Sequence, residues 1–290
     1  LPPVFESPEV SGRTSEIAAG QTGLKAGTPV VGGAGDQAAS AVGSGIAGPG
    51  QVSVTIGTSG VVFSHLDEPA CDPQGRVHTF CHAVPGKWHL MGVTQGAGLS
   101  LQWFRNQLGQ DLVAEAKRKQ VDPYELCTAL AAEAPAGSDG LFWLPYLMGE
   151  RTPHLDAEAR GGWIGLTAKH TRAHLLRAII EGVSYSLRDC LEILRGLGVE
   201  PAQVRASGGG ARSEFWRGVL AGVFDCPIVT LQTQEGSAYG AALLAMAGSG
   251  PFQSVPEACA ATIREIGRVD PDPPAVAQYE RGYTIFRSLY

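Results

Sequence analysis

The stretch from Val30 to Ala38 constrains the fold of this chain more than any other. It runs through two valines, four small residues, one acid, a glutamine and an alanine. This order predicts a strand, a tight turn and a helix that begins at Asp36. Glycines in such a turn let a ligand approach the backbone closely. In an open α/β sheet, ligands bind beyond the carboxyl ends of the strands, so Asp36 is placed to reach one.

Two interpretations of Asp36 are open from this stretch alone. Carboxylates are common general bases, which favours a catalytic role. Aspartate is also a favoured residue at the start of a helix, where its side chain accepts from free backbone N–H groups. Whether Asp36 is a general base or a helix-capping residue depends on the motifs in the rest of the chain.

The rest of the chain predicts a mixed α/β protein. Strands in succession are followed by helices and then by a strand–helix–strand–helix order, with one hairpin turning near Pro85 and a long ordered loop at 145–154. The expected strands are 28–31, 52–56, 61–63, 76–84, 87–93, 141–144, 204–207 and 228–231. The expected helices are 38–44, 97–108, 111–119, 124–133, 171–197, 213–224 and 235–247, with two amphipathic helices closing the chain.

Composition excludes several classes of function. The net charge of -6 offers no basic face for nucleic acid. No apolar run approaches the roughly 20 residues of a membrane span, and no signal peptide is visible. The six cysteines form no CxxC pair and predict buried, reduced thiols, which indicates the cytoplasm. The chain begins at Leu1 and not at Met, so we expect a piece of a longer protein.

Two glycine-rich turns are candidates for ligand contact. Gly57-Thr58-Ser59-Gly60 joins two β-type runs and is either a nest of amides and hydroxyls for a phosphate or a plain hairpin turn. Gly208-Gly209-Gly210 joins a strand to a helix, where three glycines allow close approach and the helix start supplies amide donors. The chain contains no GxxxxGK[ST] sequence, which excludes a P-loop.

Three other patterns give less information about function. The sequence from Gly43 to Gly48 matches GxGxxG but follows a helix and precedes Pro49, so it predicts a connector near a hinge. Residues His65, His78, His82 and His89 lie near Cys71 and Cys81 without the spacing of a zinc site, so no metal ligand is assigned. Glu150 and Arg151 are read either as a structural ion pair or as ligand contacts.

Taken together, several motifs resemble the FGGY carbohydrate kinases. Residues 33–39 resemble the catalytic-aspartate motif of that family, 56–60 its second phosphate loop and 206–216 its adenosine motif. Residues 161–182 resemble its C-terminal signature, and 150–154 resemble its xylulokinase branch. The matches keep the family's order and cover nearly the whole chain.

The resemblance implies an actin-like ATPase fold, which is also called ribonuclease H-like, with a mixed sheet flanked by helices. Residues 1–45 would be the end of the N-terminal domain. Residues 46–290 would be the C-terminal nucleotide-binding domain, with a closing C-terminal helix. A cleft would separate the two domains.

The same resemblance implies roles for individual residues. Asp36 would accept the proton of the attacking sugar hydroxyl, and Gln37 would also touch the sugar. ATP would be the cofactor, with Mg²⁺ held mainly through the nucleotide and the missing N-terminal half. Ser213 stands where many family members have Asn. The residues implied to bind the nucleotide are Gly57, Thr58, Ser59, Gly98, Gln102, Gly209, Gly210 and Ser213.

The function implied is ATP-dependent phosphorylation of a sugar hydroxyl, with D-xylulose as the leading substrate and D-xylulose 5-phosphate as the product. Gluconokinase, glycerol kinase and ribulokinase activities are the alternatives within the family. A non-catalytic, actin-like module that binds a nucleotide or senses a sugar is the alternative outside it. Without the family's first half we expect the 290 residues alone to be inactive. The partner expected is a small-molecule sugar; the sequence leaves the oligomeric state open, a homodimer included.

Overall fold

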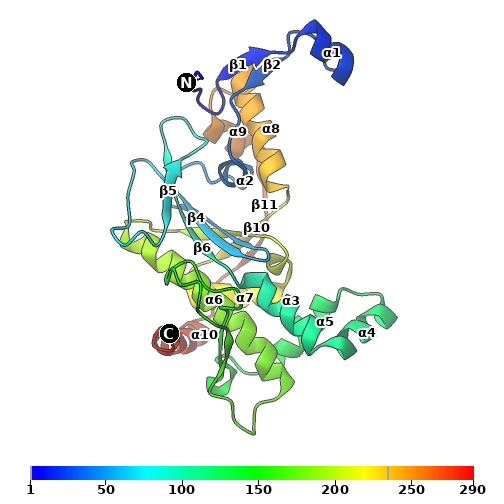
Figure 1. Ribbon diagram of the computed structural model, residues 1–290, viewed down its shortest axis with the longest axis vertical. Coiled ribbons are helices and arrows are strands. Elements are labelled where there is room, and N and C mark those ends of the chain that lie inside the picture. Colours follow the sequence, from blue (N-terminus) through cyan, green and yellow to red (C-terminus); the bar gives the residue numbers. More distant parts are fainter. Residues whose placement is uncertain (1, 234) are drawn as a thin grey trace.

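The computed structural model describes residues 2–233 and 235–290 (Figure 1). Its strands are β1 (Val10–Arg13), β2 (Pro29–Val31), β3 (Gln51–Ile56), β4 (Gly60–Leu66), β5 (His78–Cys81), β6 (Trp88–Thr94), β7 (Phe142–Leu144), β8 (Gly162–Ile164), β9 (Gln203–Ser207), β10 (Ile228–Leu231) and β11 (Glu265–Val269). Its α-helices are α1 (Glu16–Thr22), α2 (Asp36–Gly43), α3 (Ala97–Gln107), α4 (Gln110–Lys119), α5 (Pro123–Ala132), α6 (Arg172–Gly196), α7 (Glu214–Phe224), α8 (Gly236–Ser249), α9 (Val255–Thr262) and α10 (Pro273–Phe286). Two 3₁₀ turns are η1 (Ser138–Gly140) and η2 (Gly210–Arg212).

A seven-stranded mixed sheet forms the centre of the fold, in the order β11-β10-β9-β3-β4-β6-β5. Strands β10, β9 and β3 are parallel neighbours, whereas β4, β6 and β5 continue from β3 in antiparallel pairs. The prediction of a mixed sheet is therefore confirmed. The expected strand 76–84 is shorter than predicted, since only His78–Cys81 is paired.

Strand β11 was not predicted from the sequence. It pairs antiparallel with β10 at the edge of the sheet, between the two helices that were expected to close the chain. Most of its side chains are exposed, so it lacks the apolar alternation that marks a half-buried strand. The short strands β1 and β8 were missed as well.

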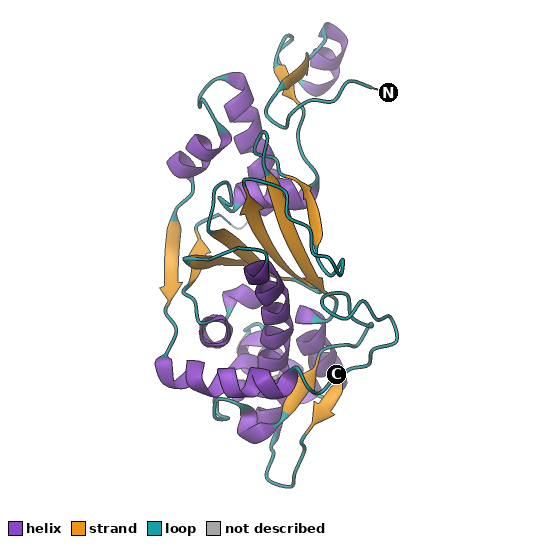
Figure 2. Ribbon diagram, turned by 90° about the vertical axis from the view of Figure 1, so that its left-hand side faces the viewer, coloured by secondary structure: helices purple, strands orange, loops and turns teal. Residues whose placement is uncertain are grey.

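Helices cover both faces of the sheet (Figure 2), with α6, α7 and α10 on one side and α2, α8 and α9 on the other. Alternate residues of a strand point to opposite faces, and each face has its own core. Val54 of β3 packs into the large core with Leu187 of α6. Phe63 of β4 packs on the other face with Ala41 and Ile46.

Helix α6 is the central helix of the larger layer. It is 25 residues long and begins after Thr171, whose hydroxyl and the side chain of His174 form a reciprocal capping pair. Strands and helices pack around it on several sides, so its central turns are buried throughout and not only along the predicted stripe. Arg177 and Glu181 are paired at 2.7 Å within this core, which satisfies both buried charges.

The N-terminal residues form a separate small unit of β1, α1 and β2, at the end of the molecule far from α6 (Figure 1). Strand β2 and helix α2 form as predicted on either side of residues 32–35. Within the described chain, however, β2 pairs only with β1, antiparallel, and does not join the main sheet. The expectation that Asp36 lies beyond a strand end of a large open sheet is therefore wrong.

The prediction of six buried thiols holds for only four of the cysteines. Cys71 and Cys81 are exposed, whereas the other four are buried, and all six are free. The exposed pair lies in and before β5, the outermost strand at its end of the sheet. Among the described residues, no helix combines the length and the apolar character that crossing a membrane requires.

Candidate active site

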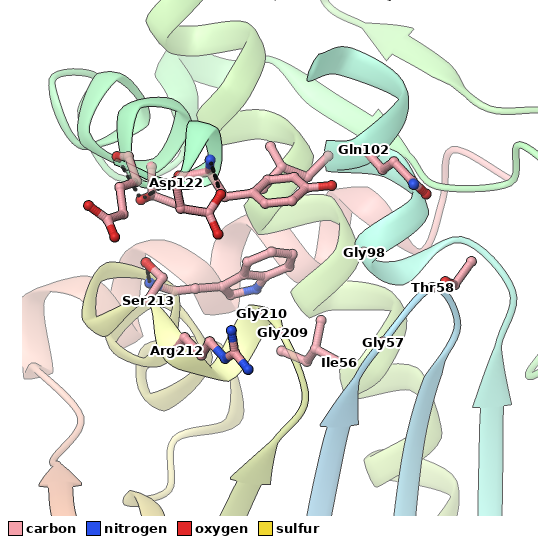
Figure 3. Close-up of a pocket in the computed structure, with 15 residues that line it drawn as sticks. Ile56, Gly57, Thr58, Gly98, Gln102, Asp122, Gly209, Gly210, Arg212 and Ser213 are labelled. Atoms are coloured by element: carbon pink, nitrogen blue, oxygen red, sulfur yellow. Dashed lines mark hydrogen bonds between the residues drawn. The ribbon is translucent and has the colours of Figure 1, made fainter. Parts of the chain in front are cut away.

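A cavity of about 490 Å³ opens where β3 and β9 end, between α3, α5 and α7 (Figure 3). All the residues predicted to bind the nucleotide line it except Ser59. They come from three separate places in the chain: the β3–β4 turn, the start of α3, and the segment that leads from the turn after β9 into α7. Figure 3 shows Gln102 and Asp122 on the side opposite Gly209, Gly210 and Ser213.

The β3–β4 turn is both a hairpin turn and part of the cavity wall. β3 and β4 are paired up to Ile56 and Gly60, and the turn between them rests on the start of α3. There Gly98 N–H donates to the Gly57 carbonyl at 2.8 Å, and Leu99 N–H donates to the Thr58 carbonyl at 3.1 Å. A side chain at position 98 would overlap the Gly57 carbonyl, so only glycine allows this approach.

The turn after β9 packs directly on the end of β3. Gly208 has a positive φ of 83°, and a Cβ at this position would lie 2.6 Å from the Ile56 carbonyl oxygen. A Cβ at Gly210 would lie 2.5 Å from Ile56 Cγ2. At Gly209, in contrast, an added Cβ meets no described atom within 4 Å. The outer glycines therefore bring the two turns together, and the middle one leaves space on the cavity side.

Ser213 combines a place in the cavity wall with a capping role. Its hydroxyl accepts from Trp216 N–H at 3.3 Å, so it is the N-cap of α7. The hydroxyl retains a proton to donate to a ligand. An adenosine contact by Ser213 stays a prediction.

The wall formed by α5 was not found from the sequence. This wall contributes Asp122, Tyr124, Glu125 and Thr128 to the cavity lining, and Asp122 lies across from Gly209 and Gly210 (Figure 3). Leu101 and Trp216 add apolar surface. Asp122 caps α5 by accepting from Tyr124 N–H at 2.9 Å. The sequence Asp-Pro at 122–123 is typical of a helix start, but it carries no information about which turn that start faces.

Asp36 and Gln37 lie on the first turn of α2 and are exposed. The Gln37 side-chain amide is 3.4 Å from an Asp36 carboxylate oxygen, and Ser237 Oγ donates to the Asp36 backbone carbonyl at 2.9 Å. Neither Asp36 nor Gln37 is among the described residues that line the cavity. Ser59 is not among them either; its carbonyl accepts from Gly57 N–H at 3.0 Å within the hairpin turn.

Glu150 does not pair with Arg151 within the described ranges, so the ion-pair interpretation is wrong. The Glu150 carboxylate is buried and accepts from Thr94 Oγ1 at 2.6 Å and from the N–H groups of Gln95 and Arg151 at 2.9 and 2.7 Å. Burial raises the pKa of Glu150, and these hydrogen bonds oppose the shift. The residue fastens the 145–154 loop to the end of β6, next to the start of α3.

The described residues contain no group of three His, Cys, Asp or Glu side chains that could hold a metal ion. A Mg²⁺ ion would therefore need the nucleotide phosphates, or residues outside this chain, for its ligands.

Comparisons with known proteins agree with the resemblance. The FGGY family of carbohydrate kinases matches with its C-terminal domain at residues 52–249 and with its N-terminal domain at residues 1–43. The xylulose kinase of Bacillus subtilis is 36% identical over 289 residues, which cover 100% of this chain and 56% of that protein. The gluconokinase of the same organism is 36% identical over 236 residues, 81% of this chain and 46% of the relative.

A solved xylulose kinase from Rhodospirillum rubrum has a TM-score of 0.89 at 36% identity, and the match covers 100% of this chain and 57% of that structure. The similarity confirms the predicted actin-like fold class, with a mixed sheet flanked by helices. The chain thus spans little more than half the length of these xylulose kinases.

Proposed function

The chain belongs to the FGGY family of carbohydrate kinases, and from this premise we propose that the protein in which it occurs transfers the γ-phosphoryl group of ATP to a sugar hydroxyl. The observation that carries the proposal is the cavity at the ends of β3 and β9, which is lined by predicted nucleotide contacts from three distant parts of the chain. The proposed domain division is 1–45 and 46–290. The cytoplasm is the proposed compartment, supported by six free cysteines.

D-xylulose is the proposed acceptor and D-xylulose 5-phosphate the proposed product. Relatives named xylulose kinase match over the whole chain, whereas the gluconokinase of Bacillus subtilis matches over 81% of it. Because the chain covers about 56% of the xylulose kinases, sugar-contacting residues outside it contribute to this choice.

The two glycine-rich turns are proposed to hold the nucleotide. Phosphoryl transfer depends on positioning and on neutralising charge, because the transition state is loose. Thr58 offers a hydroxyl at the tip of the hairpin, and Gly209 leaves its backbone accessible on the cavity side. The apolar surface of Leu101 and Trp216 suits the flat face of a base.

Asp36 is proposed as the base. The sugar hydroxyl oxygen forms a bond to the γ-phosphorus, its proton passes to the Asp36 carboxylate, and ADP leaves with the electron pair of the broken P–O bond. The exposed carboxylate makes few contacts in the described chain, so it is free to accept a proton from a ligand. Gln37 is proposed to hold the same sugar.

One observation favours a second candidate, a nucleotide-binding or sugar-sensing module without catalysis. Asp36 is not among the described residues that line the cavity, so in this conformation the proposed base and the nucleotide site are separate. The family fold places a cleft between two domains, and closing such a cleft would bring the groups together. Replacing Asp36 distinguishes the two candidates, because only the kinase needs its carboxylate as a base.

The proposal is tested by measuring ADP release from ATP with the natural protein, including everything that flanks these residues. We expect D-xylulose to be used with a kcat/KM at least about tenfold above gluconate, glycerol and D-ribulose, since even one net hydrogen bond, worth about 0.5–1.5 kcal/mol, approaches that factor. Faster turnover of another acceptor would redirect the substrate assignment. If none of these acceptors releases ADP, the kinase proposal is wrong.

Replacing Gly209 by Ala tests the nucleotide site separately from the chemistry. The added methyl meets no described atom within 4 Å, so the melting temperature without ligand should stay unchanged. If the nucleotide approaches this backbone, the Kd for ATP should rise about tenfold, as titration calorimetry would show. Gly218→Ala on α7 is the matched control, because its methyl also enters open space and Gly218 is not among the described residues lining the cavity. Equal Kd values for the two variants would remove Gly209 from the site.

A further inference from the structure

Helix α8 packs directly against α2, the helix that begins at Asp36. We propose that Gly236, Ser237 and Gly240 of α8 are positioning residues for Asp36, acting through the spacing between α8 and α2. This inference rests on the proposed function, because it assumes that Asp36 takes part in phosphoryl transfer. It assigns a role to an element that none of the sequence motifs included.

The backbones of α2 and α8 touch. A Cβ on Gly240 would overlap the Ala39 carbonyl, and a Cβ on Gly43 would overlap the Gly236 carbonyl. Figure 1 shows α2 beside the lower half of α8. Helices normally pack with axes 8–10 Å apart, held off by their side chains. Here glycine removes that spacer, so the position of α2 follows α8 directly.

Both ends of α2 are tied to other elements. At the N-terminal end, Ser237 Oγ donates to the Asp36 carbonyl at 2.9 Å. Just beyond the C-terminal end, Arg205 Nη1 donates to the carbonyls of Ser44 and Gly45 at 3.0 and 2.6 Å. Arg205 lies on β9, the strand that leads into the glycine turn of the cavity. Helix α2 therefore has a C-terminal anchor on the nucleotide-binding sheet and an N-terminal contact to α8.

This arrangement makes the N-terminal end of α2 sensitive to the spacing. Gly240 contacts α2 at Ala39 and Gly43, and Arg205 holds the chain just beyond Gly43, so pushing α8 away at Gly240 tilts α2 and moves Asp36, at the far end, the most. A misplacement of about 1 Å in a reacting group can cost on the order of 10²-fold in rate. The cavity is not built from α2 residues, so nucleotide binding should be spared.

The contact at Gly236 offers a test with an internal rescue. A Cβ there would lie 2.5 Å from Ser40 Oγ, a side-chain atom, and at an ordinary 3.4 Å from Ser40 Cβ. Gly236→Ala should therefore lower kcat, and adding Ser40→Ala should relieve the overlap and restore it. Gly240→Ala meets a backbone carbonyl, so no side-chain change should rescue it. Gly218→Ala on α7 is the control for adding a helical methyl.

The experiment measures kcat, KM for ATP, Kd for ATP and the melting temperature in the natural protein. We expect Gly240→Ala to lower kcat about 10- to 100-fold and Gly236→Ala and Ser237→Ala about three- to tenfold, each with KM and Kd for ATP within twofold of the parent. The double variant should return to within twofold of Ser40→Ala alone. A purely structural role would lower the melting temperature without this split between kcat and KM.

The outcomes separate this inference from the proposed function. If the parent phosphorylates no sugar, the proposed function fails, and the inference fails with it. If the parent is active and the folded variants keep the parental kcat, the inference alone is overturned. If Gly240→Ala does not fold, Gly236→Ala with its rescue and Ser237→Ala decide the question. Loss of ATP affinity in step with kcat would also overturn the inference, because the cavity and not Asp36 would then have moved.

Discussion

Replacing Asp36 by Asn is expected to lower kcat for sugar phosphorylation by about 10²–10⁴-fold, the usual contribution of a general base. Asparagine keeps the size and the hydrogen-bonding shape of the side chain but cannot accept the hydroxyl proton. Asp36 is exposed and is not among the described residues that line the cavity, so the Kd for ATP should stay within twofold of the parent. ADP release with D-xylulose, and calorimetry with ATP, would measure the two quantities.

A structural role for Asp36 makes a different prediction. Its carboxylate sits in the first turn of α2, where a negative charge is worth about 0.3–1 kcal/mol to the helix. If that were its whole contribution, Asp36→Asn would cost a small amount of stability and leave kcat unchanged. Asp272→Asn, which changes the capping acid of α10, is the matched control for losing such a charge. A kcat within a factor of three of the parent would favour the non-catalytic nucleotide-binding alternative.

The two glycine-rich turns that form the cavity could be predicted from the sequence, because the backbone conformation of each turn depends on neighbouring residues. Gly208 needs a positive φ, and Gly57 stands at the end of an alternating strand. These requirements appear as glycines next to β-type runs, whatever the rest of the chain does. The same holds for the start of α2 at Asp36. Short-range patterns thus gave both turns and the candidate base.

What the sequence did not show depends on contacts between distant residues. Asp122 and Tyr124 reach the cavity because α5 packs against α6 and α7, which begin 40 and 82 residues after α5 ends. Nothing near Pro29 indicates that β2 pairs with β1 and not with the main sheet, because both arrangements suit a short apolar strand. Tertiary packing decides such cases, and an exposed edge strand such as β11 carries almost no pattern to recognise.

Three histidines from β4, β6 and the turn between β5 and β6 meet inside the fold, and their burial is expected to make the stability of the protein depend on pH. His65, His82 and His89 are buried on the α2 side of the sheet, where the His65 and His82 rings are 5.2 Å apart and the His82 and His89 rings 5.7 Å apart. His65 also approaches Asp67, which pairs with Lys87. Burial lowers the pKa of His82 to about 3 and that of His89 to about 4. Both rings are therefore neutral in the folded protein at pH 5.

The sign of the effect follows from proton binding in the two states. Below the ordinary histidine pKa of about 6.5, the unfolded chain binds protons that the folded protein excludes, so the free energy of unfolding falls as the pH falls. Each of the two rings should cost about 2 kcal/mol between pH 7.5 and pH 5. Asp189 acts in the opposite direction. Burial raises its pKa to about 6, so the folded protein binds this proton more readily than the unfolded chain, and the free energy of unfolding rises as the pH falls. Because the parent and the histidine variants all contain Asp189, its contribution cancels when their free energies of unfolding are compared.

We therefore expect His89→Leu to remove about 2 kcal/mol, and His82→Leu with His89→Leu about 4 kcal/mol, from the stability lost between pH 7.5 and pH 5. Urea unfolding of parent and variants at both pH values gives these differences, and the values at pH 7.5 serve as the control for packing changes. Asp72 does not interfere, because its pairing with Arg76 lowers its pKa to about 2, and the stability this provides is lost only below about pH 4. Identical pH dependence in parent and double variant would mean that the buried rings accept protons in the folded state. Water would then have to reach the three histidines between the sheet and the residues following α2. The conclusion that His82 and His89 are buried as neutral rings would be wrong.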